Sequence, residues 1–155
     1  MKKKRDMFYG YVDDIDEITD VPPEDIYECP LTCVGATYYV DLPKRFIDEQ
    51  RPPDNVHFST WYQRILFTFM PLNEKYYLRI VKRTATHVRV VFPLKLVRQR
   101  GLFFYNAIFL IRIEKGVFLC TFSNKEKYGK DYEAPYKKPL WQLAIHCGGL
   151  HEYPL

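Results

Sequence analysis

Residues 75–122 read KYYLRIVKRTATHVRVVFPLKLVRQRGLFFYNAIFLIRIEKGVFLCTF, and their pattern indicates the fold class of the chain. Its apolar residues are rich in Val, Ile, Phe and Tyr and come in strand-length runs broken by turn signals, a pattern that favours β-sheet. Between Lys75 and Ile113 the chain has nine Lys or Arg and no Asp or Glu. An uncompensated basic surface on a β-rich unit is the usual electrostatic footprint of a polyanion binder. The alternative is a solvated basic face without a ligand.

Turn signals divide the rest of the chain into short elements, and the aromatic content of 17% favours sheet over a helical bundle. Pro43 and Pro93 each fit the first turn of a helix, and Gly101 is suited to ending the second one. We therefore predict helices at 43–50 and 93–100, an extended piece leading to residue 32, and strands at 37–42, 64–70, 75–82, 88–92, 107–113 and 117–122. Residues 58–62 are ambiguous. A chain of 155 residues of this kind predicts a single, mainly β (α+β) domain.

The charges of the chain are distributed unevenly. Residues 1–60 carry a net charge of −6 and residues 61–155 a net charge of +10. Residues 6–28 hold nine acidic residues and no Lys or Arg, which is typical of a segment that is extended or disordered in isolation. We predict an acidic, flexible leader at 1–25, a β domain at 26–123, and a polar extension with a short apolar cap at 124–155. The leader either only solvates the chain or folds over the basic face and competes with a polyanion.

The sequence offers little that could support catalysis. Its only two serines, Ser59 and Ser123, do not lie in a Gly-x-Ser-x-Gly motif, and its four histidines are scattered. It has no phosphate-binding glycine loop and no His-Glu-x-x-His pair. We therefore expect a protein that is not an enzyme and that uses no cofactor.

The cysteines and the hydropathy of the chain indicate whether it binds a metal and where in the cell it is located. A zinc site built from Cys29, Cys33, His146, Cys147 and His151 is conceivable, but the chain has no second short Cys pair, so we expect no metal. The cysteines are instead expected to be reduced thiols. The sequence has no apolar run long enough to span a membrane and no secretory leader, which favours an intracellular protein without a membrane partner.

Three motifs between residues 26 and 122 carry a resemblance to a known family. They are Leu-Thr at 31–32 with YYVDLPKRF at 38–46, the hairpin 66–81 with NEKY at 73–76, and the segment 94–109 with RGL at 100–102. Their order is similar to that of the plant-specific "B-three" DNA-binding domain of auxin-response, abscisic-acid-insensitive and reproductive-meristem transcription factors. The chain departs from the family pattern at 92–93, where Phe-Pro replaces Gly-Trp, and at 105–106, where Tyr-Asn replaces Gly-Asp.

The resemblance implies an open pseudobarrel of about seven strands with two short helices. It also implies sequence-specific binding of double-stranded DNA and transcription regulation in a plant nucleus. Two loops, at 32–38 and 82–89, would clamp the major groove, and the basic excess points to the second of them independently. Most of the predicted contacts would hold phosphates, whereas Arg83, His87 or Arg89 would reach base edges. The predicted DNA-binding residues are Thr32, Thr37, Lys44, Arg45, Lys82, Arg83, Thr84, Thr86, His87 and Arg89.

Two other functions stay open at the level of sequence. An RNA or single-strand binder would use exposed Tyr62, Tyr77 or Tyr105 as stacking platforms. A β-barrel that engages a protein partner, or a second copy of itself, would hold its acidic leader against the basic face. Aromatic side chains aligned on one open sheet face would favour the first alternative, and a compact leader would favour the second.

Overall fold

The computed structural model describes residues 14–61, 64–72, 76–133 and 138–139, and a single antiparallel sheet dominates them. Its strands are β2 (Ile26–Val34), β3 (Thr37–Asp41), β4 (Asn55–Trp61), β5 (Arg64–Thr68), β6 (Tyr76–Ile80), β7 (Lys82–Arg83), β8 (Val88–Val91), β9 (Ala107–Glu114) and β10 (Val117–Thr121). They are arranged in the order β6-β4-β5-β10-β9-β2-β3-β8-β7. Two further short strands, β1 (Ile18–Thr19) and β11 (Lys138–Pro139), pair in parallel beside this sheet.

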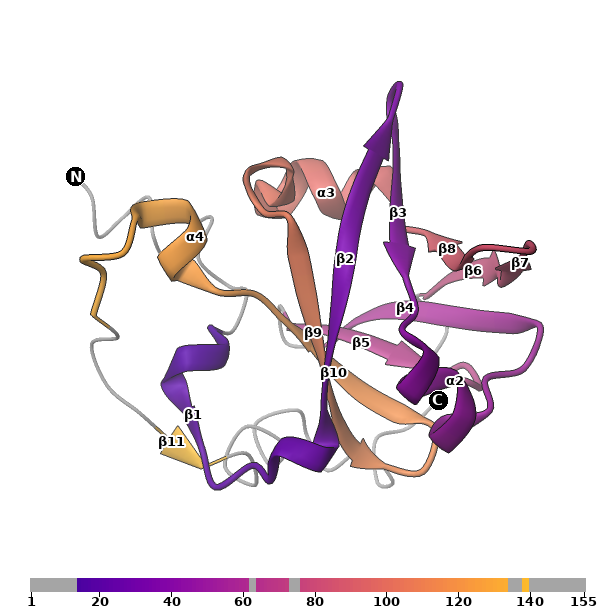
Figure 1. The fold of residues 1–155 in the computed structure, drawn as a ribbon, viewed down its shortest axis with the longest axis horizontal. Helices are drawn as coiled ribbons and strands as arrows, with labels where there is room; N and C mark the ends of the chain where they lie inside the picture. The colour runs from indigo at the N-terminus through magenta and orange to yellow at the C-terminus, as the bar shows by residue number, and fades with distance from the viewer. Residues whose placement is uncertain (1–13, 62–63, 73–75, 134–137, 140–155) are drawn as a thin grey trace.

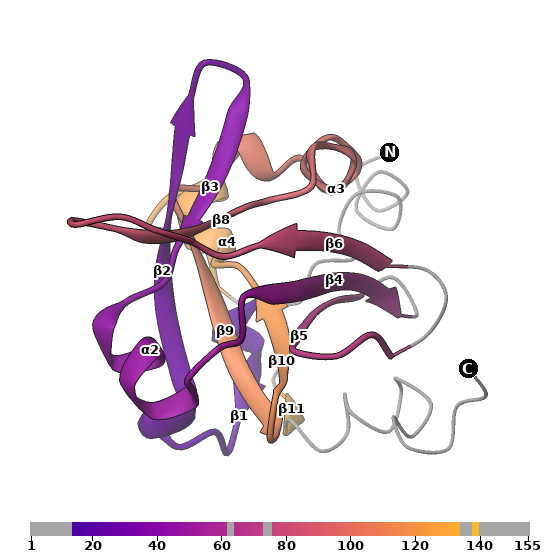
Figure 2. The same cartoon turned by 90° about the vertical axis from the view of Figure 1, so that its right-hand side faces the viewer.

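The sheet curls on itself, so that its edge strand β6 lies beside β8 and the barrel is nearly closed (Figures 1 and 2). This confirms the predicted fold class. The described sheet has nine strands rather than about seven, for two reasons. The ambiguous segment around residue 58 is β4, and the strand expected at 75–82 is divided into β6 and β7. The division falls at Val81, whose N–H donates to the carbonyl of Asp54 at 2.8 Å, outside the strand ladders.

The core fills the inside of this barrel. Along β2, Tyr27, Cys29 and Leu31 are buried and alternate with less buried neighbours, as expected for a strand with one face inward. The ring of Phe46 lies among several aromatic rings, with centroids 5.0 Å from those of Tyr27 and Phe118. One continuous apolar cluster therefore connects the strands with the helix that carries Phe46.

The strands are connected or flanked by short helices. The α-helices are α2 (Lys44–Gln50), α3 (Leu94–Arg100) and α4 (Asn124–Tyr128), and the 3-10 helices are η1 (Ile15–Glu17), η2 (Pro23–Asp25) and η3 (Leu102–Phe104). Pro43 and Pro93 immediately precede α2 and α3, so each helix begins one residue later than predicted. Gly101 ends α3 in the left-handed conformation, with φ of 67°, which a glycine adopts without a Cβ clash. The two helices expected from the sequence are both present.

A second apolar cluster lies on the outer face of β5, β9 and β10. Its buried members are Leu66, Ile111, Val117 and Leu119, and among the residues packed against them are Ile15, Ile18, Val21 and Ile26. The N–H of Ile15 also donates to the carbonyl of Phe122 at 2.8 Å. Residues 14–25 of the predicted leader are thus packed against the barrel, on the side away from the β7–β8 hairpin (Figure 1), and they do not cover the basic loop. Residues 1–13 and the predicted cap at 140–145 lie outside the described residues.

None of the helices in the described residues is long and apolar enough to cross a membrane.

Candidate nucleic-acid interface

Two β-hairpins extend from the barrel and bear the two loops that the sequence singled out. The first joins β2 to β3 through a turn at Gly35 and Ala36, and residues 33–36 at its tip are exposed. The second joins β7 to β8, and residues 82–87 are all exposed. The β2–β3 hairpin rises above the rest of the molecule in both views, whereas the β7–β8 hairpin points sideways (Figures 1 and 2).

The two hairpins share one ladder, because β3 pairs with β8. Tyr39 lies opposite Val91 and Asp41 lies opposite Arg89 in this antiparallel pair. The tips therefore project from opposite ends of the β3–β8 ladder. A single sheet fixes both hairpins relative to each other and leaves their tips exposed.

Hydrogen bonds within the β7–β8 turn hold its shape. The N–H of Thr84 donates to the carbonyl of His87 at 2.8 Å, and the N–H of His87 donates to Oγ1 of Thr84 at 3.0 Å. Oγ1 of Thr86 lies 2.8 Å from Nδ1 of His87. When Nδ1 is the acceptor in this bond, the neutral imidazole carries its proton on Nε2 and can donate it outward. The turn is thus preorganised, and the hydroxyl of Thr84 is used within it.

A polar cluster occupies the place where the two hairpins meet. The carboxylate of Asp41 on β3 accepts from Oγ1 of Thr32 at 2.8 Å and from Nε of Arg89 at 3.0 Å, with one oxygen for each donor. The guanidinium carbon of Arg89 also lies 4.9 Å from the centroid of the Tyr39 ring. The side chains of Arg89 and Asp41 are only 21% and 19% exposed, so water weakens this ion pair less than it would a surface pair. Thr32 donates its proton here rather than to a ligand.

Three more of the predicted DNA-binding cations have partners in the chain. Lys44 pairs with Asp48 at 2.7 Å, and this hydrogen bond raises the pKa of Lys44. Arg83 pairs with Asp54 at 2.9 Å and donates to the carbonyl of Pro52 at 3.0 Å. These contacts tie the β7–β8 hairpin to the loop before β4.

Arg45, the third of these cations, is held most firmly. It pairs with Glu49 at 3.2 Å, its guanidinium lies 4.0 Å from the centroid of the Tyr27 ring, and it donates to the carbonyls of Glu24 and Ile26. These contacts fix α2 against the start of β2. Arg45 therefore has a structural role.

The predicted residues thus fall into two groups. The β7–β8 hairpin carries Lys82, Arg83, Thr84, Thr86, His87 and Arg89, and the β2–β3 hairpin that pairs with it carries Thr32 and Thr37. Lys44 and Arg45 lie on α2, with carboxylates four residues further along the helix. Lys82 is exposed and makes no ion pair with the residues that the structure describes. Among the five predicted cations, it is the one without an acidic partner in the described residues.

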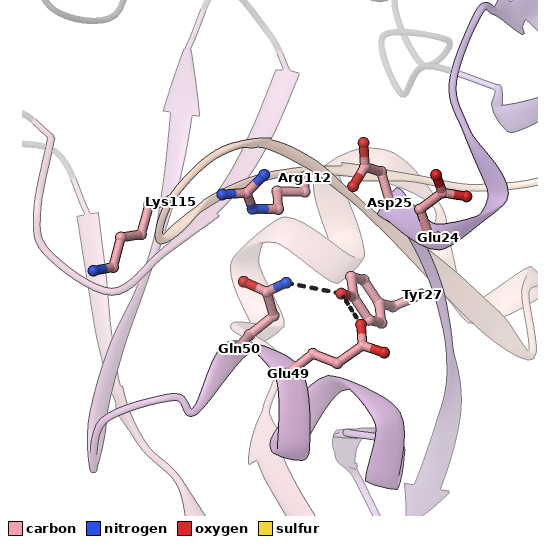
Figure 3. Close-up of a pocket in the computed structure, with 7 residues that line it drawn as sticks. All are labelled: Glu24, Asp25, Tyr27, Glu49, Gln50, Arg112 and Lys115. Carbon is pink, nitrogen blue, oxygen red and sulfur yellow. Dashed lines mark hydrogen bonds between the residues drawn. The ribbon is translucent and has the colours of Figure 1, made fainter.

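The structure also shows groups that sequence reasoning missed. Asp41 was counted only as part of a family motif, although it is the acceptor that joins both hairpins. A polar hollow of about 350 Å³ was also missed, and Figure 3 shows the side chains around it. It is lined by Glu24, Asp25, Tyr27, Glu49, Gln50, Arg112 and Lys115. No local signal marks either feature, because each is assembled from distant strands and loops.

In the hollow, the hydroxyl of Tyr27 donates to Glu49 at 2.7 Å and accepts from Gln50 at 2.8 Å (Figure 3). Burial, and then the hydrogen bond to Glu49, raise the pKa of Tyr27, so the phenol stays protonated at neutral pH. Carboxylates and basic groups both line the walls. The hollow is a mixed-charge surface rather than a site that favours a polyanion.

The structure shows how exposed two of the three tyrosines are that a single-strand binder would use for stacking. Tyr105 is buried, and its hydroxyl donates to Asn124 at 3.0 Å. Tyr77 is partly buried and packs against the core, and Tyr62 lies outside the described residues.

In the described part of the chain, no three His, Cys, Asp or Glu side chains gather as metal ligands would. Comparison with known proteins adds no assignment, since no family model, curated protein or solved structure matches the chain.

Proposed function

We propose that this protein binds double-stranded DNA through its two hairpins, reads sequence in the major groove and acts in transcription regulation in the nucleus. The observation that carries the proposal is the exposed, preorganised β7–β8 hairpin with Lys82 at its base, paired through β8 with a second exposed hairpin. The major groove of B-DNA is about 12 Å wide and admits a two-stranded β-ribbon. Each hairpin is such a ribbon.

The distribution of charge supports the same surface and predicts how binding depends on salt. Lys82 lacks an acidic partner among the described residues, whereas Lys44, Arg45, Arg83 and Arg89 each have one. The pairs of Lys44 and Arg83 are exposed and hence weak, so either cation can exchange its carboxylate for a phosphate. Lys82 adds a phosphate contact without breaking an ion pair, and its contribution to the salt dependence is therefore the cleanest to measure.

The test is binding of the full chain to a random pool of duplexes across a salt series. Each neutralised phosphate contributes a slope of about −0.9 to the plot of log affinity against log salt. Lys82→Ala is expected to flatten that slope by about 0.9. Lys115→Ala is the matched control, because it removes the same charge from an exposed turn between β9 and β10. Its slope should match that of the wild type.

The outcomes separate the possible functions. A flatter slope for Lys82→Ala alone, together with enrichment of a sequence in the pool, supports a specific reader of DNA. Equal flattening by both variants would show that only the overall charge matters. Absence of binding at low salt would refute the proposal.

A protein-interaction module is the second candidate, and one surface favours it. Phe103 and Phe104 in η3 are 51% and 60% exposed, with ring centroids 4.5 Å apart, and Leu94 on α3 is also exposed. Exposed aromatic side chains that adjoin one another are characteristic of protein interfaces. Self-association through this surface would appear in sedimentation as a mass that depends on concentration and that Phe103→Ser reduces to that of a single chain.

A further inference from the structure

We infer that Asp41 is a positioning residue that presents Arg89 to a guanine base in the major groove. The inference rests on the proposed function and deepens it, since it names the side chain that reads sequence and the group that orients it. It is carried by the polar cluster at the junction of the hairpins. That cluster joins β2, β3 and β8 through Thr32, Asp41 and Arg89.

Asp41 engages only one edge of the Arg89 guanidinium. The carboxylate takes the Nε of Arg89, at 3.0 Å, whereas the terminal Nη1 and Nη2 make no hydrogen bond with any residue in the described part of the chain. Those two nitrogens form the donor pair that matches O6 and N7 of guanine. Asp41 therefore holds the guanidinium by its inner edge and leaves the reading edge unoccupied.

The second step concerns the orientation of the guanidinium plane. The ring of Tyr39 lies 4.9 Å from the guanidinium carbon, and the second oxygen of Asp41 is fixed by Thr32. An arginine side chain ordinarily loses considerable rotamer freedom when it binds, and prior ordering reduces that loss. The cluster makes Arg89 a preorganised donor fork rather than a mobile charge.

A positioning role of Asp41 differs measurably from mere charge repulsion. A carboxylate next to DNA repels phosphates, so removing Asp41 should strengthen non-specific binding or leave it unchanged. Removing a positioning group should weaken only the discrimination of the correct base. Replacing Asp41 should therefore raise or preserve the affinity for non-specific DNA while lowering the discrimination between bases. One substitution distinguishes the two roles.

The experiment measures, for wild type, Asp41→Asn and Arg89→Lys, the affinity for three kinds of duplex. These are the duplex enriched from the random pool, the same duplex with each guanine changed in turn to adenine, and an unselected duplex. A bidentate arginine–guanine pair discriminates against the wrong base by roughly 5- to 150-fold. In both variants we expect that discrimination to disappear at one guanine position, while the affinity for the unselected duplex stays unchanged or rises. Arg89→Lys keeps the charge but not the fork.

Three results would overturn the inference. One is that Asp41→Asn tightens all duplexes equally and keeps its base discrimination, which would make Asp41 only a repulsive charge. Another is that Arg89→Lys retains discrimination at every guanine. The third is that the wild-type chain binds no duplex. That result would refute the proposed function as well, and it is distinguishable because it is seen before any variant is tested. A urea unfolding curve for each variant confirms that it is folded, and Thr32→Val, which removes only the support of Asp41, serves if Asp41→Asn does not fold.

Discussion

Replacing Phe46 with alanine is expected to lower the free energy of unfolding by about 4 kcal/mol. Phe46 is fully buried, and its ring joins α2 to the apolar core of the barrel. Its ring centroid lies 5.0 Å from those of Tyr27 and Phe118 and 6.1 Å from that of Phe67. Truncation therefore removes aromatic contacts on several sides and opens a cavity at the centre of the core.

The magnitude follows from the usual cost of this truncation. Replacing a buried phenylalanine by alanine typically costs about 3–5 kcal/mol in all, which includes the lost ring contacts and the cavity left behind. The helix cannot compensate, because α2 has only seven residues and so short a helix is not stable in isolation. Since a domain of this size is stable by about 5–15 kcal/mol, the variant should lose a large part of its stability.

Equilibrium unfolding in urea measures the difference, as a shift in midpoint at an unchanged slope. Phe104→Ala is the matched control, because the same truncation on a side chain that is 60% exposed should change stability by no more than about 0.5 kcal/mol. A loss below about 1 kcal/mol for Phe46→Ala, or equal losses for both variants, would contradict the conclusion that this ring cluster holds α2.

Two further predictions concern titratable side chains. Burial lowers the pKa of His57 below its ordinary value of about 6.5, so the unfolded state binds the proton more tightly than the native state. The contribution of His57 to the free energy of unfolding should therefore be fully present above pH 6.5. It should fall as the pH is lowered through that value, by at most about 1.4 kcal/mol per pH unit. In a pH series of urea curves, His57→Gln should have a smaller fall, and an unchanged fall would contradict the assignment. Burial also raises the pKa of the Cys29 and Cys120 thiols, whereas Cys33 is exposed. Peptide mapping after brief alkylation at pH 8 should therefore find Cys33 labelled before Cys29 and Cys120, and equal labelling of the three would show that the barrel opens freely.

Several local features of the fold could be predicted because they depend on neighbours in sequence. Apolar runs marked most of the strands, and the prolines before residues 44 and 94 marked the starts of both barrel helices. The strand β4 was left undefined from the sequence, although Val56, His57, Phe58 and Ser59 alternate between apolar and polar side chains. All four are buried, so the polar members of this alternation lie on a second buried face rather than in solvent. The packing of residues 14–25 was missed because the acidic charge of that segment outweighed its few spaced apolar residues.

The candidate site could be predicted only in outline. The excess of Lys and Arg located the β7–β8 hairpin, which the structure shows to be exposed. Whether a given cation is paired could not be read from the chain. Arg83 meets Asp54 across 29 residues and Arg89 meets Asp41 across 48 residues, and both contacts depend on which strands and loops become neighbours.

The β-rich class, the positions of both barrel helices and the basic half of the chain follow from local segments, because propensity and charge are local properties. The tertiary structure alone decided which charges remain available to a ligand. The β3–β8 register places Asp41 opposite Arg89, and the closing of the barrel brings Arg83 to the loop before β4. Strand register is a collective property of the sheet, set by how all the inward-facing residues pack together. An ion pair that depends on it exists only once the whole barrel has formed.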